Sequence, residues 1–326
     1  MCLGSLSRLK YPNWFAIVID NNSADGSARM IRDQTRSRFG DHVLIVQYSL
    51  ERACRGGDRD QETALKDASA ELRIVSIDLP ENLGFDGGHN VGIRYALLRD
   101  EPVDFVLLLN NDTDVAEDLL DRLVEAASVP GVGIAGALVI DALTQKVQFA
   151  RSRSFFYHFF FPIKDQARRK PDAETWPSNI VHGAALMIRR ELLERIHEDR
   201  GFYLNPILFA YHDELDLCLE ARRLGYRTAV AGRAVVRHRN GFRPELPQRS
   251  LLFHYYLTRN AILLARTLLP LPKRVLFHVL HTPLALRRAA KMRLLGKRPA
   301  ARAILLGLRD GYRRVGGKWE DHDVVG

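Results

Sequence analysis

The sequence predicts an α/β fold with a mostly parallel sheet that is covered by helices on both faces. Short apolar, β-branched runs alternate with helical stretches, which is typical of parallel strands joined by helical crossovers. Three of these runs end in polar clusters. The 326 residues suffice to bury a large core, as one large domain or as a domain with an added lobe.

Four strands are expected in the first half of the chain, each an apolar run closed by turn-forming or polar residues. They are "WFAIVID" (14–20), "LRIVSID" (72–78), "VDFVLLLN" (103–110) and "GVGIAGALVI" (131–140). Helices are expected from about Ser27, over 91–99 and over 115–127. Residues 52–70 are rich in charge and lack an apolar period, so we expect a surface insertion there.

The chain changes character near residue 250, which predicts an α/β domain over 1–250 and a basic helical region over 251–326. Residues 251–320 hold 15 Lys and Arg against two acids, whereas 1–250 are close to neutral. Apolar residues there recur at helical spacing between Pro270, Pro272, Pro283 and Pro299. Such helices suit an anionic membrane surface, although a helical lobe with a solvated basic face is the alternative. No motif that reads nucleic acid accompanies the charge.

Three cysteines without metal-ligand spacing favour a reducing cytoplasm. The longest uncharged stretch, 126–140, is too short and too rich in glycine to span a bilayer, and no signal peptide is evident. We therefore expect a cytoplasmic protein that is peripheral on the inner face of the plasma membrane.

Polar clusters follow three of the predicted strands. Asp20, Asn21 and Asn22 follow the first strand, Asn82, Gly84, Gly87 and Gly88 follow the second, and 110–114 follow the third. One cluster alone would be read as a turn or a helix cap. Because ligands bind at the carboxyl ends of parallel strands, three clusters at one edge indicate a binding site. They match neither an EF-hand loop nor a dinucleotide fingerprint.

Two acidic groups are candidates for chemistry. Asp112, with Asn110 and Asp114 beside it, lies just past a rigid strand and is placed to hold a hard divalent cation; His238 ends another strand and is a plausible further ligand. Asp213 and Glu214, with Asp216, begin an amphipathic helix. They could merely complement the helix dipole, but adjacent carboxylates raise each other's pKa and can furnish a general base.

Six motifs in order resemble the family 2 glycosyltransferases of GT-A fold, most of all their rhamnosyltransferase-like branch. They are "VIDNNSADGS", "ENLGFDGGHNVGI", "LLLNNDTDV", "VHGAALMIRRELL", "DELDLCLEARRLGYRT" and "VVRHRNG". The resemblance covers roughly residues 2–265. It implies a nucleotide-diphospho-sugar transferase fold, a Rossmann-like sheet with helices on both faces.

The resemblance also implies roles for residues. Asp20, with Asn22 beside it, would contact the nucleotide base, and Asn82 and Gly84 would lie near the ribose and pyrophosphate. Asn90 matches a family asparagine, whereas His89 stands where the family usually has asparagine. Asn110 and Asp112 occupy the place of the metal-binding DxD-like motif for Mg²⁺ or Mn²⁺, and His238 matches the histidine that completes it. Asp114, a neighbour of Asp112, is expected to be a further ligand of the metal ion.

The implied reaction is an inverting displacement in which Glu214 or Asp213 deprotonates an acceptor hydroxyl. The implied donor is a nucleotide sugar, dTDP-rhamnose or another dTDP- or UDP-sugar, and the acceptor is a lipid-linked or polysaccharide glycan of the bacterial cell surface. Two other classes stay open: a non-catalytic nucleotide-sugar-binding or assembly protein, and a nucleotidyltransferase, which would release pyrophosphate.

Two further expectations concern the start of the chain and an aromatic segment. The family's sheet begins with an apolar strand ahead of the helix that "MCLGSLSRLKYPN" matches, so the resemblance implies that the central strand is missing from this sequence. A misassigned start, a truncation or a damaged copy would each account for that. "FFYHFFFPI" (155–163) would stack on sugar rings near the acceptor or pack as core.

Overall fold

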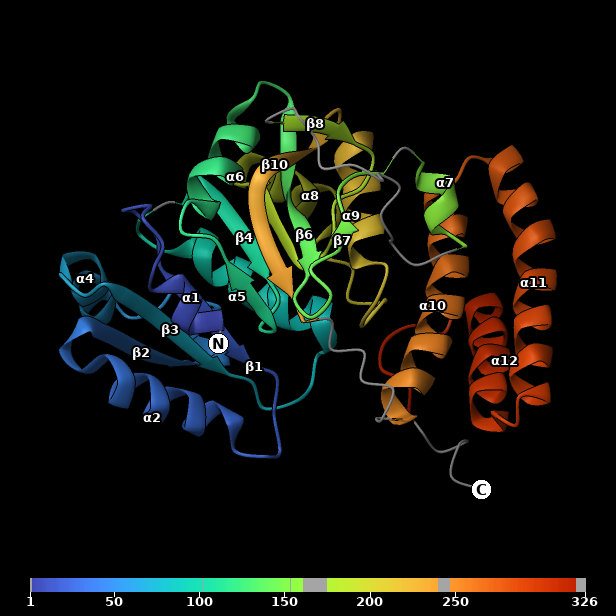
Figure 1. Cartoon of the computed structure of the whole chain (residues 1–326), viewed down its shortest axis with the longest axis horizontal. Coiled ribbons are helices and arrows are strands. Elements are labelled where there is room, and N and C mark those ends of the chain that lie inside the picture. The colour runs from blue at the N-terminus through green and yellow to red at the C-terminus, as the bar shows by residue number, and fades with distance from the viewer. Residues whose placement is uncertain (1, 102, 153, 161–174, 240–246, 321–326) are drawn as a thin grey trace.

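The computed structural model describes residues 2–101, 103–152, 154–160, 175–239 and 247–320. Two sheets lie side by side, and three long helices stand next to the second (Figure 1). The elements up to α5 are α1 (Cys2–Leu6), β1 (Ala16–Asp20), α2 (Ser27–Phe39), η1 (Gly40–His42), β2 (Val43–Ser49), α3 (Leu50–Ala53), α4 (Arg59–Asp67), β3 (Leu72–Asp78) and α5 (Gly84–Leu98).

The elements that follow build the second sheet and the helical bundle. They are β4 (Phe105–Leu109), β5 (Thr113–Val115), α6 (Leu119–Ser128), β6 (Val132–Asp141), β7 (Val147–Phe149), α7 (Phe155–His158), β8 (Thr175–Ser178), β9 (Ala185–Arg189), α8 (Arg190–Arg200), α9 (Asp213–Arg223), β10 (Arg227–His238), α10 (Pro247–Leu268), α11 (Leu271–Leu294) and α12 (Arg298–Arg313).

The first sheet has the order β1-β3-β2 and is parallel throughout. Its register runs from Ala16 opposite Ile74 to Asp20 opposite Asp78. Helix α5 leaves the end of β3 and packs Val91 and Tyr95 against the sheet. The strand predicted over 72–78 is confirmed to the residue, because an apolar run with no interior glycine or proline has no competing turn signal.

The second sheet has the order β4-β9-β6-β10-β5, with β7 paired to β6 and β8 to β10. The pair β6–β10 is parallel, and β4–β9, β6–β9, β5–β10, β6–β7 and β8–β10 are antiparallel. The α/β fold is therefore confirmed, but the single, mostly parallel sheet is corrected to a parallel sheet and a mixed one. Strand β9 follows a long excursion from β6 instead of a helical crossover, so it can return in the opposite direction.

Two local expectations also change. Helix α5 begins at Gly84 and not near residue 91. The Asn82 side chain accepts a hydrogen bond from the Gly84 N–H (2.9 Å), which forms a turn just ahead of the helix. The charged stretch 52–70 contains helix α4, which the buried Glu62 anchors to the core. The Glu62 carboxylate accepts hydrogen bonds from Tyr48 (2.9 Å), Tyr95 (2.5 Å) and Arg99 (2.6 Å).

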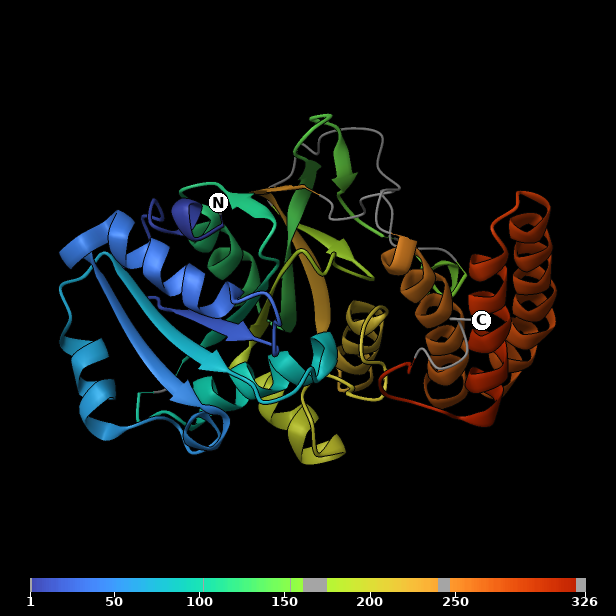
Figure 2. The same cartoon turned by 90° about the horizontal axis from the view of Figure 1, so that it is seen from below.

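Helices α10, α11 and α12 form the bundle seen beside the second sheet in both views (Figures 1 and 2). Pro270 precedes α11, and Pro272 and Pro299 lie in the first turns of α11 and α12, where proline costs least; Pro283 lies inside α11 and does not end it. Side chains of all three helices belong to the same hydrophobic cluster as the second sheet. No helix in the described part of the chain is long and apolar enough to cross a bilayer.

Candidate active site

A cavity of about 2390 Å³ opens where β1, β4 and β10 end and where α5 and α9 begin. The predicted site residues that line it are Asp20, Gly84, Asn110, Asp112, Asp213, Glu214 and His238. Residues from five separate parts of the sequence are thus brought to one place, as the strand-end clusters predicted.

Asp112 and His238 form the polar centre of one side of this cavity. The Asp112 Oδ1 atom lies 3.1 Å from His238 Nε2, and Asn110 Nδ2 lies 3.4 Å from the same nitrogen. The other ring nitrogen of His238, Nδ1, lies 3.1 Å from Gln148 Oε1, which fixes the ring's orientation. A carboxylate oxygen and an imidazole nitrogen, two atom types that bind divalent cations in proteins, thus lie side by side at the cavity wall.

Asp114 does not join this pair. Strand β5 pairs with β10 so that Thr113 lies opposite His238 and Asp114 opposite Arg237. Since side chains alternate along a strand, Asp114 lies on the other face from His238, and its carboxylate contacts Arg8 at 3.2 Å. The structure therefore separates Asp114 from the predicted metal ligands.

Asp213 and Glu214 lie in the first turn of α9 on the other side of the cavity. Their carboxyl groups are hydrogen-bonded to each other. Burial raises the pKa of Glu214 well above its usual range, and the neighbouring Asp213 charge raises it further. Burial also raises the pKa of Asp213, while its hydrogen bond with Glu214 opposes that rise. The pKa values of both acids are thus raised by burial, and the two carboxyl groups influence each other's ionisation.

The loop 181–185 connects the two sides, and the sequence reasoning assigned no role to it. The His182 ring lies 5.7 Å from the His238 ring, and burial lowers the pKa of His182 to about 3. A Cβ on Gly183 would lie 3.6 Å from Asp213 Oδ2. The Ala184 carbonyl accepts a hydrogen bond from the Asn110 N–H (3.0 Å). The motif "VHGAA" was the signal that could have revealed this loop.

Asp86 is a second residue that the sequence reasoning missed. It lies in the first turn of α5, is fully buried, and has no hydrogen-bond partner for either carboxylate oxygen within the described residues. Burial raises its pKa well above the usual range, and the charges of Asp213, Asp216 and Glu214 raise it further. The sequence feature that could have pointed to Asp86 is an acidic residue within the glycine-rich motif "GFDGG".

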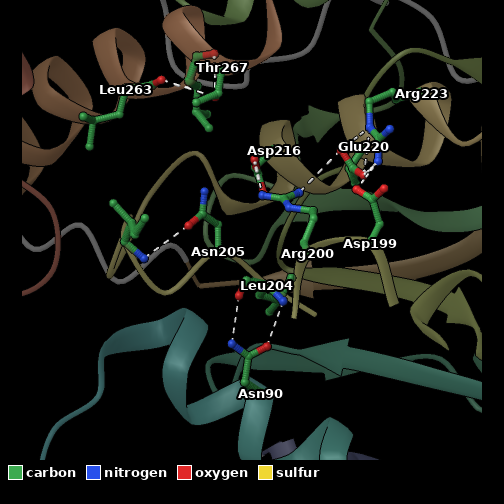
Figure 3. A network of polar contacts seen from close by, with 12 residues as sticks. Asn90, Asp199, Arg200, Leu204, Asn205, Asp216, Glu220, Arg223, Leu263 and Thr267 are labelled. Atoms are coloured by element: carbon green, nitrogen blue, oxygen red, sulfur yellow. Dashed lines mark hydrogen bonds and ion pairs between the residues drawn. The ribbon is translucent and has the colours of Figure 1, made fainter. Parts of the chain in front are cut away.

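Asp216 and Asn90 have structural partners, shown in Figure 3. The Asp216 carboxylate binds one guanidinium nitrogen of Arg200 at 2.9 and 3.1 Å. The Asn90 amide donates to the Leu204 carbonyl (2.8 Å) and accepts from the Leu204 N–H (2.7 Å), which ties α5 to the segment before α9. Both hydrogen-bonding ends of Asn90 are therefore occupied, and its side chain does not line the cavity.

The remaining predicted contacts to a nucleotide divide into two groups. Asp20 lines the cavity, and its Oδ2 atom accepts a hydrogen bond from the Ser23 N–H (3.0 Å). Asn22 is exposed and Asn82 lies in the turn ahead of α5, and neither lines the cavity. Asn21 lines the cavity and also donates to the Gly84 carbonyl at 2.7 Å. Gly84 has a φ of 77° and lies so close to Phe209 that a Cβ would meet the Phe209 carbonyl at 2.4 Å.

A loop in an unusual conformation precedes the acid pair, and α10 holds it. Phe209, Tyr211 and His212 all have φ near 67°, which is costly for residues other than glycine. The fully buried Arg259 donates to the carbonyls of 207, 208 and 317 at 3.1, 2.8 and 2.7 Å. Asn260 donates to the carbonyls of 208, 210 and 211 at 2.8 to 3.1 Å. We call these two residues the α10 clamp.

The two sheets with their helices have the GT-A fold, and comparison with known proteins agrees. The profile of the family described as "Glycosyltransferase like family 2" matches residues 2–252. The chain belongs to this family, so the resemblance found in the sequence is confirmed.

One curated relative and two solved structures illustrate the similarity. The relative is the low-salt glycan biosynthesis hexosyltransferase Agl10 of Haloferax volcanii, 27% identical over 201 residues, which are 56% of this chain and 61% of Agl10. The match therefore spans less than two thirds of that relative. Mannosyltransferase PcManGT from Pyrobaculum calidifontis, solved with GDP-Man and Mn²⁺, has a TM-score of 0.51 at 17% identity, covering 93% of this chain and 68% of its own. S. aureus TarS 1-349 has a TM-score of 0.49 at 13% identity, covering 96% and 85%.

Proposed function

We propose that this protein is a metal-dependent inverting glycosyltransferase that takes its sugar from a nucleoside diphosphate sugar. The carrying observation is the single cavity in which Asp112 and His238 lie on one side and the hydrogen-bonded acids Asp213 and Glu214 on the other. A side that can hold the diphosphate through a bound cation and a side that can accept a proton are the two parts that glycosyl transfer to a hydroxyl requires.

The residues of the first side fit a divalent cation. Asp112 Oδ1 and His238 Nε2 would hold it, with Asn110 beside them, and the remaining ligands of such an ion are ordinarily water and phosphate oxygens. When bound there, Mg²⁺ or Mn²⁺ would supply positive charge to offset the charge on the departing diphosphate. Asp20, at the end of β1, and Gly84, at the start of α5, line the part of the cavity left for the nucleoside.

The residues of the second side would handle the proton. An acceptor hydroxyl held against the Asp213 and Glu214 pair gives its proton to the ionised carboxylate of the pair, and its oxygen attacks the anomeric carbon from the face opposite the diphosphate. The bond to the diphosphate oxygen breaks, so the anomeric configuration inverts. The raised pKa of Glu214 suits a base that must accept a proton near neutral pH.

The C-terminal helices support docking at an anionic membrane, where a lipid-linked acceptor would be found. Helix α11 exposes Leu271, Val275 and Val279 at four-residue spacing, with exposed fractions of 66, 55 and 62%. Exposed basic side chains lie on the same helix, among them Lys273 and Arg287. Apolar side chains that can enter the headgroup layer next to basic ones are the features that bind such surfaces. The proposed location is therefore a peripheral one, on the cytoplasmic face of the membrane.

The test is product analysis with a panel of UDP-, dTDP- and GDP-sugars, dTDP-rhamnose first, in Mn²⁺ or EDTA. Transfer predicts release of nucleoside diphosphate and an inverted anomeric signal by NMR. Release of pyrophosphate would indicate a nucleotidyltransferase, and donor binding without turnover would indicate a binding protein. Glu214→Gln should abolish transfer and retain donor binding. If Asp213→Asn alone does so, Asp213 is the base.

A further inference from the structure

Four basic side chains that the proposed mechanism does not use cluster where α10 and α11 meet the start of α9. They are His212, His254, His281 and Arg288. His254 lies about one turn before Thr258, on the same face of α10. His281 lies about two turns before Arg288, on the same face of α11. Arg288 Nη2 donates a hydrogen bond to Thr258 Oγ1, so these faces of the two neighbouring helices meet (Figure 1).

The charges in this basic cluster have one sign. The Arg288 guanidinium acts electrostatically on three imidazole rings, those of His212, His254 and His281. No Asp or Glu in the described part of the chain acts on any of these four groups, and neither α10 nor α11 contains an acid. Burial lowers the pKa of Arg288, and no ion pair opposes that effect. A partly buried guanidinium that lacks an acidic partner favours the binding of an anion.

The cluster also has more hydrogen-bond donors than acceptors. Arg288 Nε and the Nδ1 atoms of His254 and His281 are buried and have no partner within the described residues. A buried ring nitrogen without a partner is tolerated better as an acceptor than as an N–H group, so we assign the proton of each neutral ring to Nε2. One guanidinium and two imidazole N–H groups are then available as donors, which is the chemistry that binds phosphate oxygens.

The cluster borders both the acid pair and the exposed apolar row of α11. His212 directly precedes Asp213, and its Nε2 donates to the His158 carbonyl at 3.3 Å, which fixes the ring. On α11, His281 is 6% exposed and follows the 62% exposed Val279 by two residues, so the two side chains lie on opposite faces of the helix. The donor diphosphate is assigned to the other side of the cavity. An anion held beside the acid pair would therefore belong to the acceptor.

We propose that Arg288, His254 and His281 bind the phosphate group of the acceptor, a glycan that is joined to its lipid through a phosphate ester. The inference rests on the proposed function, because it names the chemistry of the acceptor that the acid pair would deprotonate. Arg288 would donate charge-assisted hydrogen bonds to the phosphate oxygens, and the two Nε2–H groups would donate further ones. A lipid-linked acceptor carries its phosphate between lipid and sugar, and the cluster borders the surface proposed for each.

The test is calorimetric titration of the full chain with octyl phosphate and with octyl glucoside, which lacks the phosphate, both below their micellar concentrations and in EDTA. We expect octyl phosphate to bind at least about tenfold more tightly than octyl glucoside. Arg288→Met should weaken octyl phosphate binding at least about tenfold, and His254→Phe at least about threefold. The matched control is Arg302→Met, which removes the same charge from an exposed position on α12 and should change binding less than about twofold. Because the Arg288 charge has no acidic partner, Arg288→Met should keep or raise Tm.

Equal binding of octyl phosphate by the unmodified chain, Arg288→Met and His254→Phe would overturn the proposal, and so would equal binding of the two octyl compounds. Sedimentation with phosphatidylglycerol vesicles then separates the acceptor from membrane lipid as the source of the phosphate. We expect Arg288→Met and Arg302→Met to bind these vesicles equally. If Arg288→Met binds them more weakly, the cluster takes a lipid headgroup and the proposed source is wrong. The titration needs no sugar donor, so failed glycosyl transfer would count against the proposed function alone.

Discussion

Replacing Arg259 with methionine tests whether the α10 clamp positions the proposed catalytic acids. The buried guanidinium donates to three carbonyls, two of which belong to the loop that leads into α9. A hydrogen bond from a charged group contributes about 1.5–3 kcal/mol, and relief from burying the charge offsets part of the loss. We expect a net loss of about 4 kcal/mol in the free energy of unfolding, or about 6 °C in Tm.

The loop residues with positive φ should then relax, which moves Asp213 and Glu214. We expect kcat to fall about 100-fold while the KM for the donor changes less, since a displacement near 1 Å can have that effect on rate. Thermal unfolding and donor-saturation kinetics measure both quantities. Arg266→Met is the matched control on the same helix, because Arg266 makes one 3.3 Å hydrogen bond at the surface. A loss of less than 1 kcal/mol, or a destabilised variant with normal kcat, would refute the reasoning.

Three further predictions follow from side chains in and around the site. Asp112→Asn should lower Mn²⁺-dependent transfer at least about 100-fold. Asp114→Asn should change the transfer rate less than about threefold, because the wild-type Asp114 carboxylate contacts Arg8 instead of His238. Similar losses in the two variants would contradict the assignment of Asp112 to the metal site. Because burial raises the folded-state pKa of Asp86, its contribution to stability is full below the unfolded pKa and is lost as pH rises. Asp86→Asn should therefore raise Tm at pH 8 and leave it unchanged at pH 4. Equal Tm shifts at the two pH values would exclude the ionisation of Asp86 as the cause. Val279→Asp should weaken binding to phosphatidylglycerol vesicles about tenfold in sedimentation assays. The control is Leu143→Asp, which changes an 81% exposed position away from α11 and should leave binding unchanged. Equal effects of the two substitutions would argue against docking through α11.

The parts of the fold and site that sequence predicts are those set by local chemistry. The strand over 72–78 and the polar residues at the ends of β1 and β4 follow from apolar periodicity and turn residues, which act within a few positions of each other. The proximity of Asp112 and His238, 126 positions apart, was expected from their places at strand ends and from the family resemblance, and the structure confirms it at 3.1 Å. Their role in binding metal stays a prediction.

Other features depend on packing that no local pattern encodes. Asp114 faces away from His238 because of its register in the antiparallel pair β5–β10, and the expected parallel sheet gave no reason to anticipate that pair. Asn90 matched a family motif, but its amide binds the Leu204 backbone. Helix α10, far along the chain, contributes Arg259 and Asn260 to the loop before α9. The aromatic segment 155–163 lies partly outside the described residues, and within them Phe159 packs against Phe277 of α11.

The most direct test of the central claim is calorimetric titration of the unmodified chain with UDP, dTDP and GDP, in Mn²⁺ and in EDTA. A diphosphate held through a cation on Asp112 and His238 predicts that one nucleotide binds at least about tenfold more tightly with Mn²⁺, and that Asp112→Asn removes this difference. Binding that is equal in EDTA, or that Asp112→Asn leaves unchanged, would contradict the proposed donor site.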